Sequence, residues 1–158
     1  MSVSNVEAEV DSEKRSELAE NKSSLAELIL EQIADAVIYA DETGTIRRWN
    51  QAAVVLFGYD ASEALGHNLD LIIPEHLRTA HWRGFEAAIT IGVMKLQGRP
   101  TLTRAAHKTG RKLYVEMTFA LVKEQGGGAV RGAVAIARDV TERIEQQRAS
   151  ANPKVTGG

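Results

Sequence analysis

Strict alternation of apolar and polar side chains over residues 113–121 is the pattern that most constrains this chain. The apolar positions are Leu113, Val115, Met117, Phe119 and Leu121. Successive side chains of a strand point to opposite faces of a sheet, so this spacing predicts a strand with one face on a core. A slip of one residue would turn the whole apolar set toward solvent, which specifies the register of pairing strongly.

Four further strands and several helices are expected around this strand. Turn residues and β-rich runs predict these strands at 36–41, 45–49, 100–107 and 129–138, and the alternating strand itself at 112–122. Two short helices end at Gly58 and Gly66, and a longer helix runs from about Pro74 to Ile91, since Gly92 follows it. This order of elements indicates an α+β domain with a single sheet.

Composition limits the classes of function. A chain of 158 residues is long enough for one domain with a real core. Its formal net charge of -2 gives no general electrostatic reason to bind nucleic acid or an anionic membrane. No apolar run approaches the roughly 20 residues that span a bilayer, and no signal core is visible, so we expect a cytoplasmic protein. Because the chain has no cysteine, disulfides, iron–sulfur clusters and thiolate zinc sites are excluded.

The ends of the chain are more polar than its middle. Residues 1–24 are expected to be a weakly ordered or helical arm, residues 25–146 the domain, and residues 147–158 a flexible tail. Ser24 and Glu27 have the spacing of a capping box, which predicts that a helix begins there.

Two histidines lie in the predicted helix at 74–91 and differ in environment. Leu77, His81 and Phe85 recur at four-residue spacing, which places His81 in an apolar stripe facing the fold. His76 lies well round the helix and should face water. The plainer interpretation of His81 is a core histidine that is hydrogen-bonded to a backbone carbonyl.

Several separated motifs give the chain a family likeness. An asparagine follows the second predicted strand, "LFGY" forms a turn, "HKTG" forms another, and "RDVTER" closes the last strand. In this order they resemble a PAS sensor domain from roughly Leu25 to Gln146. The resemblance implies a five-stranded antiparallel sheet with short helices on one face, enclosing a ligand pocket. It also implies a signalling role and no enzyme activity.

The resemblance narrows the choice of ligand. The flavin-binding light sensors of this fold need a cysteine in "NCRFLQ", and the chain has neither the residue nor the motif. The FixL-type gas sensors hold haem b through a histidine seven residues after the proline of "PEPxRxRH". Here "PEHLRTAH" puts His81 at that position. The resemblance therefore implies haem iron bound by His81 and a diatomic gas, O2, CO or NO, as signal.

The same resemblance assigns the rest of the pocket. Leu77 and Phe85 would flank the iron ligand, and Lys95 falls where a haem propionate partner lies, with Arg99 and Arg104 nearby. Thr101 stands where the oxygen sensors carry an arginine that contacts bound gas, so that contact is absent here. The expected distal lining is Leu102, Phe119, Leu121, Val134 and Ile136.

Partners follow from the flanking segments. PAS domains commonly dimerise through the helix before the first strand, and the helix around residues 16–33 could supply an apolar seam of Leu18, Leu25, Leu28 and Ile29. We expect a homodimer that signals to a downstream protein or output domain. The alternatives are a cofactor-free or metabolite-binding module and a dimerisation domain without any ligand.

Overall fold

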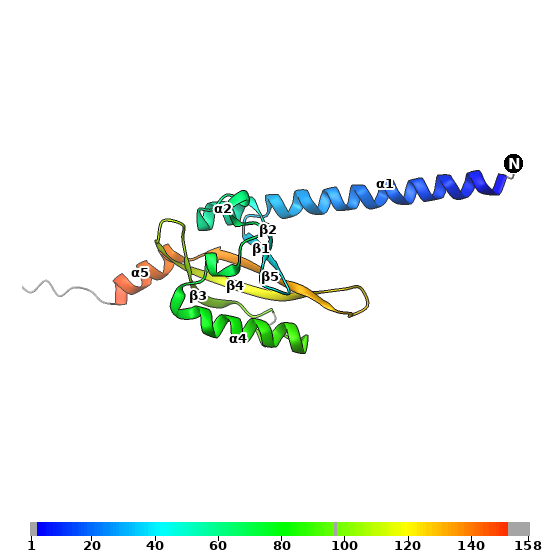
Figure 1. Ribbon diagram of the computed structural model, residues 1–158. Helices are drawn as coiled ribbons and strands as arrows, with labels where there is room; N and C mark the ends of the chain where they lie inside the picture. Colours follow the sequence, from blue (N-terminus) through cyan, green and yellow to red (C-terminus); the bar gives the residue numbers. More distant parts are fainter. Residues whose placement is uncertain (1–2, 97, 152–158) are drawn as a thin grey trace, which may run out of the picture. The chain divides into compact units, whose positions relative to one another are not determined.

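The computed structural model describes residues 3–96 and 98–151 (Figure 1). The chain divides into two compact units, residues 1–33 and residues 34–158. The first unit is one helix, α1 (Val3–Gln32), and the second holds the sheet and the remaining helices. The part of the predicted tail at 152–158 lies outside the described residues.

Helix α1 does not begin where the capping pattern placed its start. It passes through Ser24 and Glu27 as continuous helix, so the predicted start at Ser24 is wrong. Four apolar side chains on α1 are 52–59% exposed; they are Leu18, Leu25, Leu28 and Ile29. The predicted division between arm and domain at residues 24 and 25 stays a prediction.

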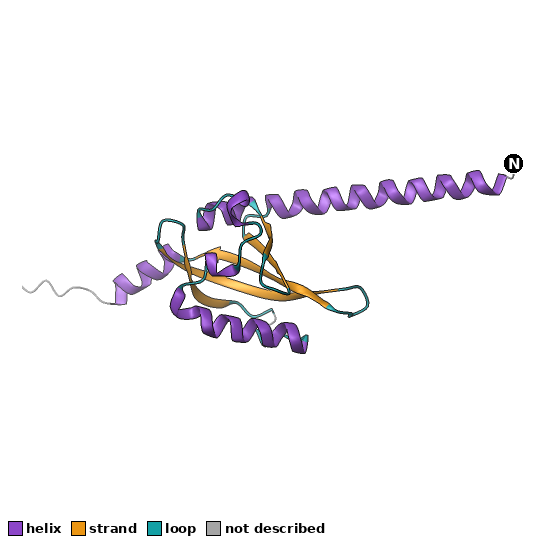
Figure 2. Ribbon diagram, in the orientation of Figure 1, coloured by secondary structure: helices purple, strands orange, loops and turns teal. Residues whose placement is uncertain are grey.

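The second unit is built on a five-stranded antiparallel sheet (Figure 2). Its strands are β1 (Ala36–Asp41), β2 (Ile46–Trp49), β3 (Thr101–Ala106), β4 (Lys112–Lys123) and β5 (Val130–Asp139). Their spatial order is β2-β1-β5-β4-β3, so the first and last strands of the chain pair at the centre. The five predicted strands and the α+β class are confirmed.

The burial pattern of β4 shows which side chains lie on the inner face of the sheet and which lie on the outer face. Leu113, Val115 and Met117 are buried in the core cluster, and they alternate with half-exposed residues. Met117 lies opposite Ala137 of β5 and Thr101 of β3. The inner face therefore carries the odd-numbered residues of all three strands, as the alternation in β4 predicts.

Three of the residues predicted to line the pocket lie on the other face. Leu102 pairs with Glu116, Val134 with Ala120, and Ile136 with Thr118, all on the outer face of the sheet. Grouping Leu102, Val134 and Ile136 with Phe119 and Leu121 in one pocket was therefore wrong. The cause lies in β5, where small and apolar residues occupy both faces.

The inner positions of β5 are taken by Ala133, Ala135 and Ala137, which pair with the inner residues of β1. Because β5 is apolar at both odd and even positions, its sequence shows no alternation from which the inward-facing residues could be predicted.

Asn50 fixes the corner where the chain leaves the sheet for its helices. Its side-chain oxygen accepts hydrogen bonds from the N–H groups of Val37 (2.9 Å) and Ala53 (3.0 Å). Its amide donates to the carbonyl of Asp35 (3.1 Å). The residue is 0% exposed, and it caps α2 (Gln51–Phe57), which ends at Gly58.

Three more helical segments lead to β3: α3 (Ala61–Ala64), the 3-10 helix η1 (Leu69–Leu71) and α4 (Glu75–Ile91). Pro74 is the N-cap of α4 and Gly92, with φ of 73°, ends it, so the predicted helix at 74–91 is confirmed. Lys123, which continues the inner stripe of β4, donates to the Gly92 carbonyl at 2.6 Å. This contact ties the C-terminal end of α4 to the inner side of the sheet.

The last helix, α5 (Thr141–Ala151), is held on β4. The Tyr114 N–H donates to the Thr141 hydroxyl at 3.0 Å. Arg148 lies over the Tyr114 ring, 4.8 Å from its centroid. These contacts anchor the helix that leaves the sheet.

Asn50→Ala should lower the free energy of unfolding by about 3 kcal/mol, because it removes a helix cap and leaves buried backbone groups without partners. Urea denaturation measures this loss. Asn68→Ala is the matched control, since Asn68 caps η1 through one bond to the Asp70 N–H (2.9 Å) in an exposed position. A loss of less than about 1 kcal/mol is expected there. Equal losses in the two variants would contradict this role of Asn50.

Candidate functional site

His81 is the most unusual polar side chain of α4. Its ring is half-buried, and its Nδ1 atom is buried without a hydrogen-bond partner among the described residues. Unpaired buried polar atoms are rare in folded proteins because each costs about 1–3 kcal/mol. The plainer interpretation, a core histidine hydrogen-bonded to a backbone carbonyl, thus finds no such bond at Nδ1 among the described residues.

Two aromatic rings surround this imidazole. The Phe85 ring is stacked on it, with centroids 6.0 Å apart and planes at 26°, and the Trp82 ring meets it edge-on at 5.0 Å. Burial lowers the pKa of His81 below its usual value of 6.5, and the charge of Asp70 offsets part of this shift. The ring is therefore neutral at pH 7, the state in which an imidazole nitrogen can bind a metal.

The inner face of the sheet carries apolar side chains and few polar groups. Phe119 and Leu121 are half-buried there although both belong to the inner stripe of β4. Ala133 and Ala135 of β5 lie opposite them and contribute only a methyl group each. Thr101 adds a half-buried hydroxyl from β3. Half-buried apolar side chains on an inner face, beside small residues, fit a flat apolar ligand.

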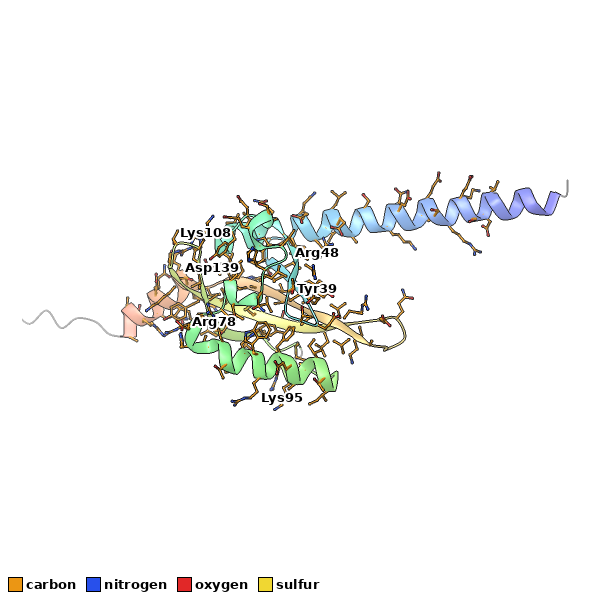
Figure 3. The ribbon with its side chains drawn as sticks, viewed as in Figure 1. Tyr39, Arg48, Arg78, Lys95, Lys108 and Asp139 are labelled. Carbon is orange, nitrogen blue, oxygen red and sulfur yellow. The ribbon has the colours of Figure 1, made fainter. Side chains whose placement is uncertain are left out.

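The remaining residues predicted for the haem pocket lie in different parts of the domain. Leu77 and Phe85 are half-buried on α4 with His81, as the stripe requires. Lys95 is exposed beyond the end of α4 and lies at the periphery of the domain (Figure 3). Arg104 is on the outer face, where its guanidinium lies 5.5 Å from the Tyr114 ring centroid. Arg104 therefore cannot contact a ligand bound at the inner face. Lys95 lies outside the sheet, so this restriction does not apply to it.

Asp70 and Trp82 are parts of this region that the sequence did not assign. The Trp82 Nε1–H donates to the Asp70 carboxylate at 2.8 Å, and the Arg78 Nε lies 3.7 Å from the same oxygen. The two partners are twelve residues apart, in η1 and α4, with no repeating pattern that links them. Only the packing of η1 against α4 brings them together.

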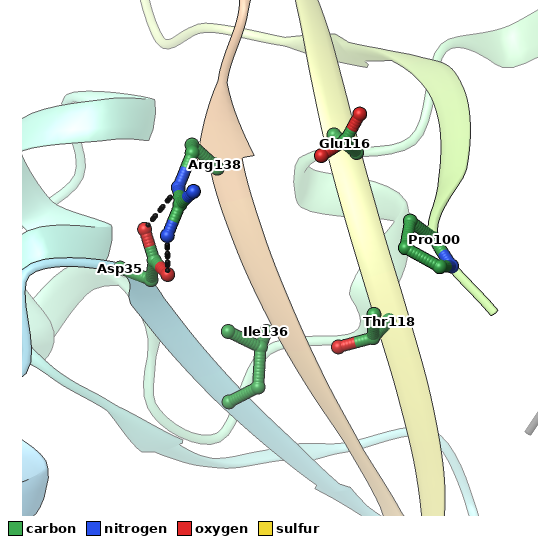
Figure 4. Close-up of a pocket in the computed structure, with 6 residues that line it drawn as sticks. All are labelled: Asp35, Pro100, Glu116, Thr118, Ile136 and Arg138. Atoms are coloured by element: carbon green, nitrogen blue, oxygen red, sulfur yellow. Dashed lines mark hydrogen bonds and ion pairs between the residues drawn. The ribbon is translucent and has the colours of Figure 1, made fainter. Parts of the chain in front are cut away.

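A hollow lies on the outer face of the sheet (Figure 4). Its volume is about 170 Å³, and its lining comprises Asp35, Pro100, Glu116, Thr118, Ile136 and Arg138. Its charges are already paired. Arg138 donates two hydrogen bonds to Asp35, at 2.9 and 2.7 Å, and lowers the pKa of that carboxyl. Arg143 bonds Glu116 at 3.3 Å. Because these charged side chains already have partners, the hollow does not need a charged ligand to neutralise them.

The described residues contain neither a cluster of side chains for a metal ion nor a membrane-spanning helix. Within residues 3–96 and 98–151, no three His, Asp or Glu side chains are grouped closely enough to hold a metal ion. Haem iron needs a single protein imidazole, so this finding bears on bare metal ions alone. No helix in the described residues is long and apolar enough to span a bilayer.

The strand order β2-β1-β5-β4-β3, with the helices between β2 and β3, defines the fold class of this domain. The family described as the PAS fold matches residues 25–140, and the chain belongs to this family. Among solved structures, a PAS domain of Colwellia psychrerythraea is similar with a TM-score of 0.65 and 22% identity, covering 76% of this chain and 98% of that one. A PAS domain of a Haloarcula marismortui HTR-like protein gives a TM-score of 0.59 and 23% identity, covering 80% and 98%.

Curated relatives are much longer proteins. The chain is 33% identical over 122 residues to an uncharacterised protein of Azorhizobium caulinodans, covering 77% of this chain and 16% of that protein. It is 30% identical over 118 residues to the oxygen sensor protein DosP of Escherichia coli, covering 75% and 14%. It is 27% identical over 146 residues to the sensor protein FixL of Bradyrhizobium diazoefficiens, covering 92% and 28%. The chain thus spans 14–28% of the lengths of these relatives, and it is a signal-sensing PAS domain.

The His81 ring should titrate below pH 6.5 in the protein without added ligand, because burial disfavours its charged form. The unfolded chain then binds a proton more readily than the folded chain. The contribution of His81 to stability is therefore complete above pH 6.5 and is lost as the pH falls below it. NMR titration of the ring, with His81→Leu to assign its signals, measures the midpoint. A midpoint at or above 6.5 would contradict the buried environment.

Proposed function

We propose that this chain is a PAS domain that binds haem b through His81 and senses a diatomic gas. The observation that carries the proposal is the buried Nδ1 of a neutral imidazole with no partner in the described residues. A ligand to haem iron needs a neutral imidazole among apolar groups, and the His81 ring lies against the rings of Trp82 and Phe85. The similarity to DosP, which is named an oxygen sensor, supports the same choice.

The residues of the inner face fit this group. His81 would hold the iron, and Leu77 and Phe85 would flank it on α4. Phe119 and Leu121 would line the opposite side, beside the small alanines of β5. Bound haem would supply an iron centre at which a diatomic gas can bind. Lys95, in the segment after α4, would reach a propionate at the rim.

The choice among gases follows from the polarity of this lining. Phe119 and Leu121 bring no hydrogen-bond donor, and the Thr101 hydroxyl faces the Arg99 carbonyl at 3.5 Å. O2 depends on polar donors more than CO or NO does. We therefore expect CO and NO to bind well and O2 to be held weakly.

His81→Ala should abolish haem uptake, because it removes the one imidazole that α4 presents to the apolar slot. His76→Ala is the matched control, since His76 is an exposed histidine on the first turn of the same helix. Soret absorption after haem titration, with circular dichroism to verify folding, is the measurement. Full haem uptake by folded His81→Ala, or none by folded wild type, would refute the proposal and leave a cofactor-free PAS module.

A pair of bulky substitutions tests the slot without touching the ligand. Ala135→Phe adds a ring on the inner face and should block haem uptake while the domain stays folded. Ala120→Phe is the control, because Ala120 is a half-buried alanine on the outer face of the neighbouring strand. If both variants bind haem as the wild type does, the slot lies elsewhere.

We also propose that the chain forms a homodimer through α1 and passes its state to an output domain or partner protein. PAS domains commonly dimerise and relay signals in this way. The exposed seam of α1, formed by Leu18, Leu25, Leu28 and Ile29, gives the association an apolar surface.

A double substitution, Leu25→Glu with Leu28→Glu, should convert the dimer into a monomer, because it places charges in the seam. Light scattering after gel filtration gives the mass. Ser24→Glu adds a charge at another exposed position of the same helix and should leave the dimer intact. A monomeric wild type, or a double variant that stays dimeric, would exclude this interface.

A further inference from the structure

The orientation of the His81 ring needs a physical cause. Histidines that bind metals generally donate their second ring N–H to a carboxylate, a carbonyl or water, and this bond fixes the ring plane. Here Nδ1 has no such partner among the described residues. The negative charge of Asp70 acts on the ring, but its carboxylate is engaged by Trp82 and Arg78. The ring must therefore be held by packing.

Trp82 supplies that packing within an aromatic cluster of His81, Trp82 and Phe85. The Trp82 ring lies edge-on to His81 at 5.0 Å and to Phe85 at 5.4 Å, with interplanar angles of 83° and 77°. Phe85 stacks on the imidazole from another side. Rotation of the imidazole about its Cβ–Cγ bond would drive it against one of these two rings.

Trp82 is itself fixed at both of its ends. Its indole N–H is bonded to Asp70, and the Arg78 guanidinium holds η1 in place by donating to the Asp70 carbonyl at 3.1 Å. The far edge of the indole rests on Gly44, a buried residue with φ of 80° in the turn between β1 and β2. A Cβ atom at Gly44 would overlap the indole ring. Trp82 is thus clamped between η1 and the β1–β2 turn.

We propose that Trp82, clamped by Asp70 and Gly44, is the positioning residue that sets the plane of the His81 ring in place of a hydrogen bond at Nδ1. For its consequence at haem iron this inference rests on the proposed function, but the positioning itself belongs to the protein without haem. Edge-to-face packing of aromatic rings is attractive and depends on the angle between the ring planes. That dependence favours one ring orientation over others.

The experiment compares two tryptophan variants by NMR of protein that carries labelled histidine. Trp82→Phe keeps an aromatic ring but loses the bond to Asp70. Trp49→Phe is the matched control, because the Trp49 Nε1–H also donates one hydrogen bond, to the Tyr59 carbonyl at 3.0 Å, within the core. The His81 ring signals should split or broaden in Trp82→Phe and stay as one set in Trp49→Phe and wild type. Unchanged His81 signals in Trp82→Phe would overturn the proposal.

Two substitutions of Asp70 separate positioning from general damage to the fold. Asp70→Asn keeps an oxygen that can accept the indole N–H, so the single set of His81 signals should be retained. Asp70→Leu keeps similar bulk without an acceptor and should reproduce the broadening seen in Trp82→Phe. Broadening in neither variant would show that Asp70 is not the anchor and would overturn that part of the proposal.

A second readout extends the test to the haem-bound protein. The iron–histidine stretching band in resonance Raman spectra should broaden or shift in Trp82→Phe and keep its wild-type position in Trp49→Phe. If the folded wild type takes up no haem, the proposed function fails, and the NMR comparison still decides the positioning role. If haem binds and the band is the same in both variants, the consequence at iron is refuted.

Discussion

The buried side chain of Asn50 is the interaction on which the arrangement of this domain depends. One amide accepts from β1 and from the first turn of α2 and donates to the residue that precedes β1. It therefore fixes the direction in which the chain leaves β2 and begins its path over the inner face. Every later segment of that path, including η1 and α4, starts from this corner. Because the amide is fully buried, no water can substitute for it, and the corner has a single low-energy geometry.

The two faces of the sheet are specialised by the size of their side chains. On the inner face, the large residues Phe119 and Leu121 of β4 lie opposite Ala135 and Ala133 of β5, which contribute only methyl groups. A well-packed domain of this length would bury those residues fully. His81, Phe119 and Leu121 are only half-buried, while Phe57 and Leu113 are fully buried. Incompletely buried apolar side chains on the inner face suit contact with an apolar ligand.

The fold can be predicted from the sequence where one physical signal dominates. The alternation in β4 and the stripe on α4 each depend on a single face being buried, so both could be predicted residue by residue. Strand β5 could not, because it is apolar at both parities and its inward set is decided by pairing with β1 and β4. The contacts that hold Trp82 between Asp70 and Gly44 could not be predicted from the sequence, for a different reason. Asp70 is a surface-type residue in a short helix, and only tertiary packing places it against the indole.

Helix α4 is anchored near its two ends by different means, and this governs what its middle can do. At the N-terminal end Arg78 donates to the carbonyls of Ile73 and Asp70, and at the C-terminal end Lys123 donates to Gly92. Between these anchors His81 projects from the helix, and its Nδ1 has no hydrogen-bond partner within residues 3–96 and 98–151. The imidazole is therefore joined to the rest of the domain by side-chain packing, first against Trp82. Trp82 in turn contacts η1 through Asp70 and the β1–β2 turn at Gly44.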